Sequence, residues 1–188
     1  MNKLILNRKS IRKFSQTAIE EDKIQLLFKA ASLAPSSYNE QPWSFIIARG
    51  NDLQNFNNLL SLMNENNKEW AKNAPLIVLA LAKRDLTVNN KPNKYYFYDV
   101  SSAVANLTYQ AVSMDLFVHQ IGGFDVVKAK TVLNIPGEYE PVVMLVIGYN
   151  ADETDETNIH NRIRKPISDF VFEKQFGNRA YNNEVLNN

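Results

Sequence analysis

The sequence predicts a single domain that combines α-helices and β-strands. The chain has 188 residues, a length at which one domain is usual and about 70% of the unfolded surface can be buried. Stretches with apolar residues at helical spacing alternate with short, continuous apolar runs of strand length. No internal repeat or low-complexity linker divides the chain, so we expect residues 1–188 to fold as one unit.

The composition excludes several classes of protein. The formal net charge is +1, so no overall field directs the chain to nucleic acid or to a membrane surface. Cysteine is absent, which excludes disulfides, thiolate metal sites and cysteine nucleophiles. No apolar run is long enough for a membrane span or a signal peptide. A cytoplasmic location is therefore expected.

The first expected helix begins at Thr17 or Glu20, where a run of acidic residues suits the positive end of the helix dipole. Apolar residues then recur at intervals of three and four, which places them on one face. Pro35 ends this helix, because proline restricts the residue before it. Residues 44–49 are predicted to form a buried strand, and residues 53–63 return to helical spacing.

The second half of the chain continues this alternation. Residues 76–82 are a continuous apolar run, which predicts a central strand. Residues 84–94 are charged and rich in asparagine, which predicts a mobile loop. Helical spacing returns over residues 99–115 and 126–133, and residues 141–149 form a second apolar run that predicts another central strand.

A basic cluster lies near the N-terminus. Four cationic residues and the hydroxyl of Ser10 fall within residues 8–13. Guanidinium groups match phosphate oxygens in a fixed fork, so this set suits a ligand that carries a phosphate. Taken alone, the cluster fits a solvated basic turn better. A nucleic-acid-binding arm is a further alternative, which the neutral balance of the whole chain disfavours.

The stretch after the first helix is polar and contains two prolines. Between Pro35 and Pro42 lie two serines, Asn39 and Gln41, whose small side chains form hydrogen bonds with the local backbone. Such a loop suits a flat polar ligand, and an ordinary polar connection is the alternative. The four aromatic residues at positions 95–98 could line a pocket, although packing at the edge of the core is expected for most of them.

Weaker signals lie near position 120. Gly122 and Gly123 would let a ligand approach the backbone, but paired glycines also occur in simple turns, and no dinucleotide fingerprint surrounds them. His119 and His160 are the only histidines. A metal site would need additional carboxylates placed by chance, so we expect no metal and a structural role for His119.

Together, these segments resemble the FMN-dependent nitroreductase family of NAD(P)H-dependent oxidoreductases, in a compact form. Residues 8–14 resemble the family's R-x-S-x-R-x-F start, and residues 34–43 resemble its A-P-S-x-x-N-x-Q-P-W loop. Residues 121–125 resemble the segment before its next helix, and residues 162–166 resemble its closing basic motif. Each match is modest alone, but the ordered set is specific and spans most of the chain.

The resemblance implies a fold and an assembly. It implies an α+β protein, a three-layer α/β/α arrangement with a mixed, largely antiparallel central sheet. It also implies a domain-swapped homodimer, in which about residues 160–188 form a C-terminal arm that reaches the partner subunit. FMN would bind at the dimer interface.

The resemblance also implies the residues that bind FMN. The phosphate and ribityl end would be held by Arg8, Ser10 and Arg164, while Arg12 would lie at the ring edge where negative charge appears on reduction. Residues from the 34–43 loop would come from the other subunit. The full implied set is Arg8, Lys9, Ser10, Arg12, Pro35, Ser36, Ser37, Asn39, Gln41, Asn67, Ile121, Gly122, Gly123, Arg162 and Arg164.

The implied activity is an oxidoreductase that takes a hydride from NADH or NADPH and reduces nitroaromatics, quinones or similar electron-poor acceptors in a ping-pong cycle. Because FMN carries the chemistry, no catalytic side chain is expected. The expected partners are a second copy of the chain and small-molecule acceptors, with no nucleic acid and no membrane. A flavin enzyme with a narrow task (dehalogenation, enone or flavin reduction) and a non-catalytic FMN-binding protein are the alternatives.

Overall fold

The computed structural model describes residues 1–152 and 162–181. The chain divides into two compact units, Met1–Glu153 and Thr154–Asn188, and each is described by itself. One domain with a C-terminal arm remains a prediction, and the part of that arm at residues 160–161 and 182–188 lies outside the described residues. No helix in the described ranges is long and apolar enough to cross a membrane.

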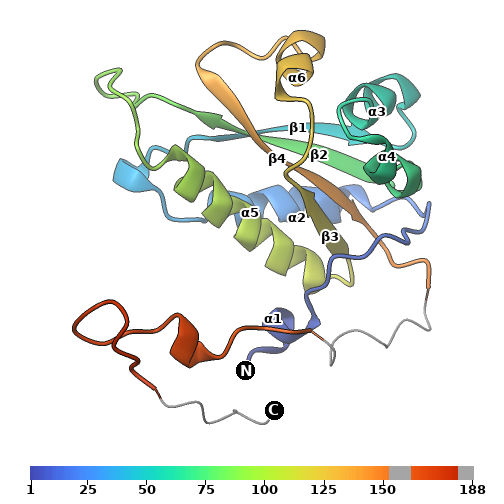
Figure 1. The fold of residues 1–188 in the computed structure, drawn as a ribbon. Helices are drawn as coiled ribbons and strands as arrows, with labels where there is room; N and C mark the ends of the chain where they lie inside the picture. Colours follow the sequence, from blue (N-terminus) through green and yellow to red (C-terminus); the bar gives the residue numbers. More distant parts are fainter. Residues whose placement is uncertain (153–161, 182–188) are drawn as a thin grey trace. The chain divides into compact units, whose positions relative to one another are not determined.

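A four-stranded sheet forms the centre of the first unit (Figure 1). Its strands are β1 (Trp43–Arg49), β2 (Leu76–Lys83), β3 (Phe117–Ile121) and β4 (Tyr139–Gly148), in the order β1-β2-β4-β3. Each of the three neighbouring pairs is antiparallel. Strands β2 and β4 therefore occupy the middle, and β1 and β3 are the edges. The predicted α+β fold with a largely antiparallel sheet is confirmed.

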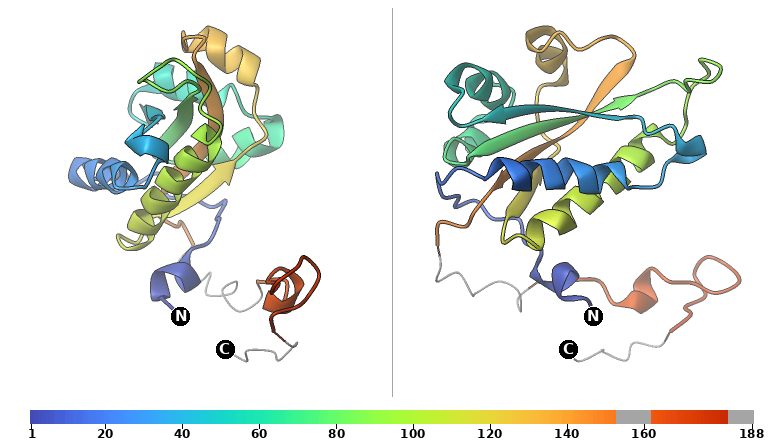
Figure 2. Two further views of the ribbon diagram at one scale, coloured as in Figure 1. Left: turned by 90° about the vertical axis from the view of Figure 1, so that its left-hand side faces the viewer. Right: turned by 180° about the vertical axis from the view of Figure 1, so that it is seen from behind.

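Helices cover both faces of this sheet (Figure 2). Helices α2 and α5 pack on one face, and α3, α4 and α6 pack on the other. The helices of the first unit are α1 (Lys3–Asn7), α2 (Glu21–Ser32), α3 (Leu53–Leu60), α4 (Glu65–Ala71), α5 (Tyr96–Val112) and α6 (Val126–Val132), with a 3₁₀ turn at Ser37–Asn39. The three-layer α/β/α arrangement follows from this placement.

The central strands are apolar throughout because both of their faces are buried. Along β2, Leu76 and Val78 point to the layer of α2 and α5, whereas Ile77 and Leu79 point to the opposite layer. All four are fully buried. This two-sided burial explains why the sequence of β2 shows no alternation of apolar and polar residues.

Two elements near the candidate site were not predicted. Helix α4 is capped by Asn64, whose side chain accepts a hydrogen bond from the backbone N–H of Asn67, but it is too short to show a periodic apolar face. Strand β3 is an edge strand of five residues, and its sequence runs directly into Gly122. Helix α5 begins at Tyr96, three residues before the predicted start, which places Asp99 inside its first turn.

The N-terminus of α2 is tied to the end of β4 by three polar side chains. The Tyr149 hydroxyl donates a hydrogen bond to Glu20, and Lys23 Nζ donates to the Tyr149 oxygen over 2.7 Å. Lys23 also forms an ion pair with Glu20. The hydrogen bond from Tyr149, the backbone N–H of Glu20 and Lys23 lower the pKa of the Glu20 carboxyl to about 2.

The substitution Glu20→Gln is expected to destabilise the protein in a pH-dependent way. Because the pKa of Glu20 is lower in the folded state, its contribution is complete above the ordinary value of 4.5 and disappears as the pH falls toward 2. Urea unfolding at pH 7, 4 and 2.5 should therefore show a gap between parent and variant that shrinks with acid. In the Tyr149→Phe background the same substitution should have a smaller effect at pH 7. A gap independent of pH would contradict the assignment.

Candidate functional site

The N-terminal basic segment is fixed along one end of the sheet. The backbone N–H of Ser15 donates to the Tyr149 carbonyl over 2.9 Å, and Phe14 forms an isolated antiparallel bridge with Asn150. Ile11 and Phe14 are buried, while Arg12 between them is exposed. Two apolar anchors thus hold the segment in place, and Arg12 points its side chain to the surface between them.

His119 of β3 forms a hydrogen bond with the backbone of this segment. Its Nδ1 lies 2.8 Å from the Ile11 carbonyl oxygen, and because a carbonyl can only accept, Nδ1 carries a proton. The His119 ring also lies 4.5 Å from the Trp70 ring, which in turn stacks on Phe14 at 6.0 Å. Burial lowers the pKa of His119 and so favours the neutral ring. This is the structural role that the sequence predicts for His119.

The turn after β3 lies beside the start of α4. Phe124 forms an antiparallel bridge with Met63, which brings the two glycines to the N-cap of α4. A Cβ atom added at Gly123 would lie 3.9 Å from Asn64 Nδ2, whereas one added at Gly122 would meet nothing within 4 Å. Gly122 and Gly123 are both exposed. The backbone of Gly122 and Gly123, beside the N-cap residue Asn64, is therefore open to a ligand.

One group of predicted residues lies on segments that are linked through β3 and Trp70. Arg8 Nη1 donates to Ser10 Oγ over 3.3 Å, and Lys9 Nζ lies 5.9 Å from the centre of the Phe117 ring at the start of β3. This first group comprises Arg8, Lys9, Ser10, Arg12, Asn67, Ile121, Gly122 and Gly123. Its guanidinium groups, ammonium group and hydroxyl suit a phosphate, and its amide and open glycine backbone suit the polar edge of a flavin. The residues present fit FMN.

The second group forms a rigid polar loop before β1. Tyr38, Asn39 and Gln41 adopt positive φ angles of 53°, 54° and 49°, which residues other than glycine rarely do. Ser36 Oγ accepts a hydrogen bond from the Gln41 N–H over 2.9 Å, and the Gln41 side chain donates to the Asn39 carbonyl over 3.2 Å. The second group comprises Pro35, Ser36, Ser37, Asn39 and Gln41.

The polar loop and the basic segment lie at opposite ends of the sheet, whereas Ile121, at the end of β3, pairs with Met144 in the middle of β4. Trp43, which follows the polar loop, pairs with Ala82, and Ala82 pairs with Glu140 at the start of β4. The basic segment instead pairs with Asn150, beyond the last residue of β4. In Figure 1 the loop between α2 and β1 is accordingly far from the segment that follows α1. A single first unit therefore does not assemble all the predicted residues.

Arg162 and Arg164 belong to the second unit, of which residues 162–181 are described. Arg164 Nη1 donates to the Ile163 carbonyl over 2.8 Å. Farther along this unit, Phe172 forms an isolated bridge with Arg179, and its ring packs against the tilted ring of Phe176 at 4.7 Å between centres. These contacts give the second unit local structure of its own.

Sequence reasoning missed Asp99 and misjudged its aromatic neighbours. Asp99 is only 2% exposed, and its Oδ2 accepts a hydrogen bond from the Ser37 N–H over 3.2 Å. The prediction that most of residues 95–98 pack at the edge of the core is wrong, because Tyr95, Phe97 and Tyr98 are exposed and, of the four, only Tyr96 packs against the core. The available signal was an acidic residue directly after the aromatic run.

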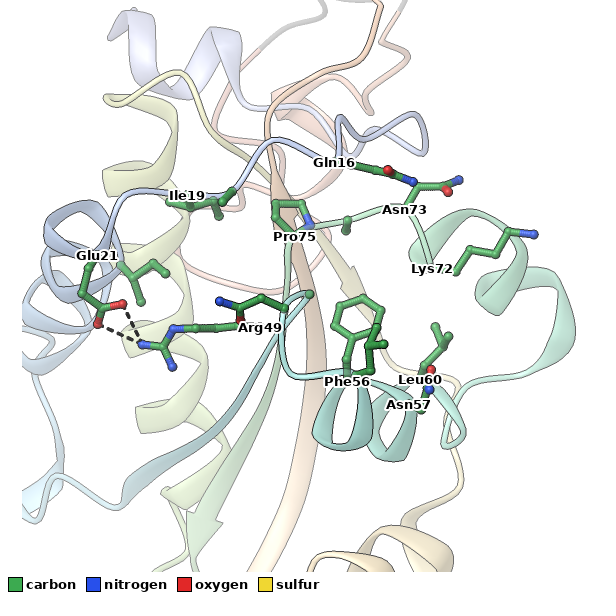
Figure 3. A pocket seen from close by; sticks show the side chains of 16 residues that line it. Gln16, Ile19, Glu21, Arg49, Phe56, Asn57, Leu60, Lys72, Asn73 and Pro75 are labelled. Carbon is green, nitrogen blue, oxygen red and sulfur yellow. Dashed lines mark hydrogen bonds and ion pairs between the residues drawn. The ribbon is translucent and has the colours of Figure 1, made fainter.

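A separate cavity of about 580 Å³ lies at the far end of β1, between the segment before α2, α3 and the turn before β2 (Figure 3). Arg49 spans its edge with two hydrogen bonds of 2.9 Å to the Glu21 carboxylate. Phe56 and Pro75 provide apolar walls. No residue of the two groups lines this cavity, so it is distinct from the predicted site.

Comparisons with known proteins agree with the geometry. A family model described as "Nitroreductase family" matches residues 5–149. A curated protein of Archaeoglobus fulgidus, "Putative NADH dehydrogenase/NAD(P)H nitroreductase", is 30% identical over 159 residues, which cover 81% of this chain and 87% of that protein. An "FMN reductase (NADPH)" of Bacillus subtilis is 26% identical over 223 residues, covering 97% and 88%.

A solved structure supports the same relationship. It is described as an oxidoreductase containing FMN and is 26% identical to this chain, with a TM-score of 0.85 over 95% of this chain and 94% of the other.

Proposed function

Because this chain belongs to the nitroreductase family of FMN-dependent NAD(P)H oxidoreductases, we propose that it reduces nitroaromatics, quinones or similar electron-poor acceptors in a ping-pong cycle. The main support for this site is the arrangement of the first group. Arg8 donates a hydrogen bond to Ser10, and their segment is held by His119 of β3, the strand that leads into Gly122. The His119 ring also packs against Trp70 of α4. These links support a site in which Arg8 and Ser10 bind the phosphate and the backbone of Gly122 meets the ring.

FMN, when bound, supplies the redox chemistry by accepting a hydride from NAD(P)H and passing two electrons to the second substrate. The residues of this chain bind and tune it. Arg8 and Ser10 would hold the phosphate, because a guanidinium and a hydroxyl both donate hydrogen bonds to its oxygens. Arg12 is exposed beside them and would stabilise negative charge on the ring. Asn67 and the backbone of Gly122 would contact the polar ring edge.

The acceptor reaction balances without an acidic or basic side chain. A quinone takes up two electrons and two protons and becomes a hydroquinone. A nitro group takes up two electrons and two protons and becomes a nitroso group and water. Water reaches the exposed glycines of the first group, so solvent can supply the protons. We therefore assign no catalytic residue.

We propose that the active form is a homodimer. The polar loop of one copy would complete the site formed by the first group of the other copy, because one first unit holds this loop and the basic segment at opposite ends of its sheet. Arg162 and Arg164 would approach the phosphate from the C-terminal arm. The outer edge of β1 is an unpaired strand edge among the described residues, and such an edge can accept an additional strand.

Reduction of free flavin is the second candidate function. The support is the relative described as an FMN reductase (NADPH), which matches almost the whole length of this chain. The two functions share the donor reaction and differ only in the acceptor, so a panel of acceptors separates them.

The test is anaerobic spectroscopy of the purified protein loaded with FMN. Addition of NADH or NADPH should bleach the flavin bands, and a nitroaromatic or a quinone should restore them. Steady-state rates should give parallel double-reciprocal lines, as expected for a ping-pong cycle. A flavin that stays oxidised with both nucleotides would indicate a non-catalytic FMN-binding protein. A flavin that bleaches but is reoxidised only by free flavin would contradict the proposed acceptors.

A further inference from the structure

The separate cavity at the end of β1 is built by three stretches that are far apart in the sequence. Its lining residues come from residues 16–24, residues 49–60 and residues 72–75. The Gly50 N–H donates a hydrogen bond to the Pro75 carbonyl over 2.8 Å, which ties the second stretch to the third. The volume of about 580 Å³ lies within the range of about 300–1,000 Å³ that is typical of small-molecule sites. The fold therefore holds open a space of ligand size.

The inner wall of this cavity is apolar. Ile19, Phe56 and Pro75 line it and are buried. In Figure 3, Phe56 and Leu60 of α3 lie on the side opposite to Ile19 and Pro75. Because removal of apolar surface from water is favourable, such a wall suits a ligand with an apolar body.

Arg49 adds a cation with unused hydrogen-bond donors to this wall. Both of its hydrogen bonds to Glu21 come from a single nitrogen, Nη2, and each is 2.9 Å long (Figure 3). Among the described residues, its Nε and Nη1 have no hydrogen-bond partner. A guanidinium donates from all three of its nitrogens, so Nε and Nη1 remain for an acceptor on a ligand.

The charges on the wall favour an anionic ligand. The charged lining residues are Arg49, Lys72 and Glu21, two cations and one anion. Glu21 lies in the first turn of α2, where the positive end of the helix dipole offsets part of its charge. The ion pair of Lys72 with Glu69 is exposed, and such pairs contribute little. A carboxylate head group fits this balance, because its oxygens accept hydrogen bonds from a guanidinium.

We propose that this cavity binds a monocarboxylate with an apolar body. Arg49 holds the carboxylate, and Phe56 and Leu60 contact the apolar part. The site is separate from the FMN site, because its lining includes no residue of the two groups. Binding involves no redox step, so the inference does not depend on the proposed acceptors or on the ping-pong cycle.

The first experiment locates the ligand. Hexanoate is titrated into the protein loaded with FMN, and the backbone amide resonances are followed by NMR. Saturable shifts should be largest at Gly50, Asn51 and Asn73, which line the cavity. Shifts confined to Gly122 and Gly123, or no saturable shift, would overturn the proposal. The titration contains neither NAD(P)H nor an electron acceptor, so its outcome is separable from that of the proposed function.

The second experiment tests the chemical class of the ligand on the parent protein. Acetate keeps the carboxylate but lacks most of the chain, and its dissociation constant should exceed that of hexanoate by more than about tenfold, since each buried CH₂ contributes about fourfold in affinity. Hexanamide keeps the chain but carries no charge, and it should bind about tenfold more weakly than hexanoate. Hexanamide that binds as tightly as hexanoate would contradict a carboxylate site.

The third experiment compares two variants that break the same ion pair. Arg49→Gln should raise the dissociation constant of hexanoate by about tenfold, because the carboxylate loses its charged donor. Glu21→Gln also removes the pair but leaves the guanidinium, so hexanoate should bind at least as tightly as in the parent. An equal loss of affinity in both variants would show that the pair only shapes the cavity. That result, or parent affinity in Arg49→Gln, would overturn the assignment of Arg49.

Discussion

Arg8→Ala is expected to weaken FMN binding by about 10- to 100-fold. A hydrogen bond to a charged group contributes about 1.5–3 kcal/mol, and each 1.4 kcal/mol corresponds to about a factor of ten in affinity. The substitution also removes the hydrogen bond from Arg8 to Ser10, so the hydroxyl loses its orientation. Arg164→Ala should weaken binding in the same direction. The measurement is the FMN dissociation constant, obtained by titrating the apoprotein and following quenching of flavin fluorescence.

Lys72→Ala provides the control for loss of a cation. Lys72 is the C-cap residue of α4, forms an ion pair with Glu69 at 2.9 Å and lines the separate cavity, so it belongs to neither group of predicted residues. Its removal should leave FMN affinity at the parent value. If Arg8→Ala and Arg164→Ala both bind FMN as tightly as Lys72→Ala does, the assignment of the phosphate site is wrong.

Gly148→Ala is expected to destabilise the protein by about 1–3 kcal/mol, the usual cost of overpacking a core. A Cβ at this position would lie 2.6 Å from Pro75 Cδ and 3.2 Å from Phe14 Cδ1. The proline ring is rigid and cannot move aside. Phe14 can move, but it anchors the basic segment, so FMN affinity should fall together with stability. Urea unfolding of the apoprotein and FMN titration measure the two effects.

Gly137→Ala separates crowding from the general effect of replacing a glycine. A Cβ at Gly137 would meet nothing within 4 Å, so this variant should unfold at the parent urea concentration. A Gly148→Ala protein as stable as Gly137→Ala would show that Pro75 and Phe14 can be displaced at little cost.

The parts of the fold that could be predicted are those with a local pattern. Strands β2 and β4 carry continuous apolar runs because both faces are buried, and α2 carries a repeated apolar stripe. Helix α4 gave no such signal, because its short length leaves only Trp70 and Ala71 as core-facing apolar residues. Its cap, Asn64, is one of many asparagines in this chain and did not stand out.

The candidate site was predictable residue by residue but not as an arrangement. Arg8, Ser10 and Gly122 belong to motifs that can be read locally. Their distance from the polar loop depends on strand register, which is a long-range property that no short stretch encodes. Asp99 could not be identified for a related reason. The sequence shows a carboxylate at a helix start, where acids are usually exposed, and only the fold places Ser37 over it.

The separation of the two residue groups has a thermodynamic consequence. The sheet between them is stiff, and an eight-residue strand spans about 26 Å, so one copy cannot bend its loop around to its own basic segment. In the proposed dimer, cofactor binding and subunit association are therefore one linked equilibrium. Excess FMN draws monomers into dimers, and dilution below the dimer dissociation constant releases FMN. The fluorescence of FMN, quenched in the complex and regained on release, would then report the state of assembly of this protein.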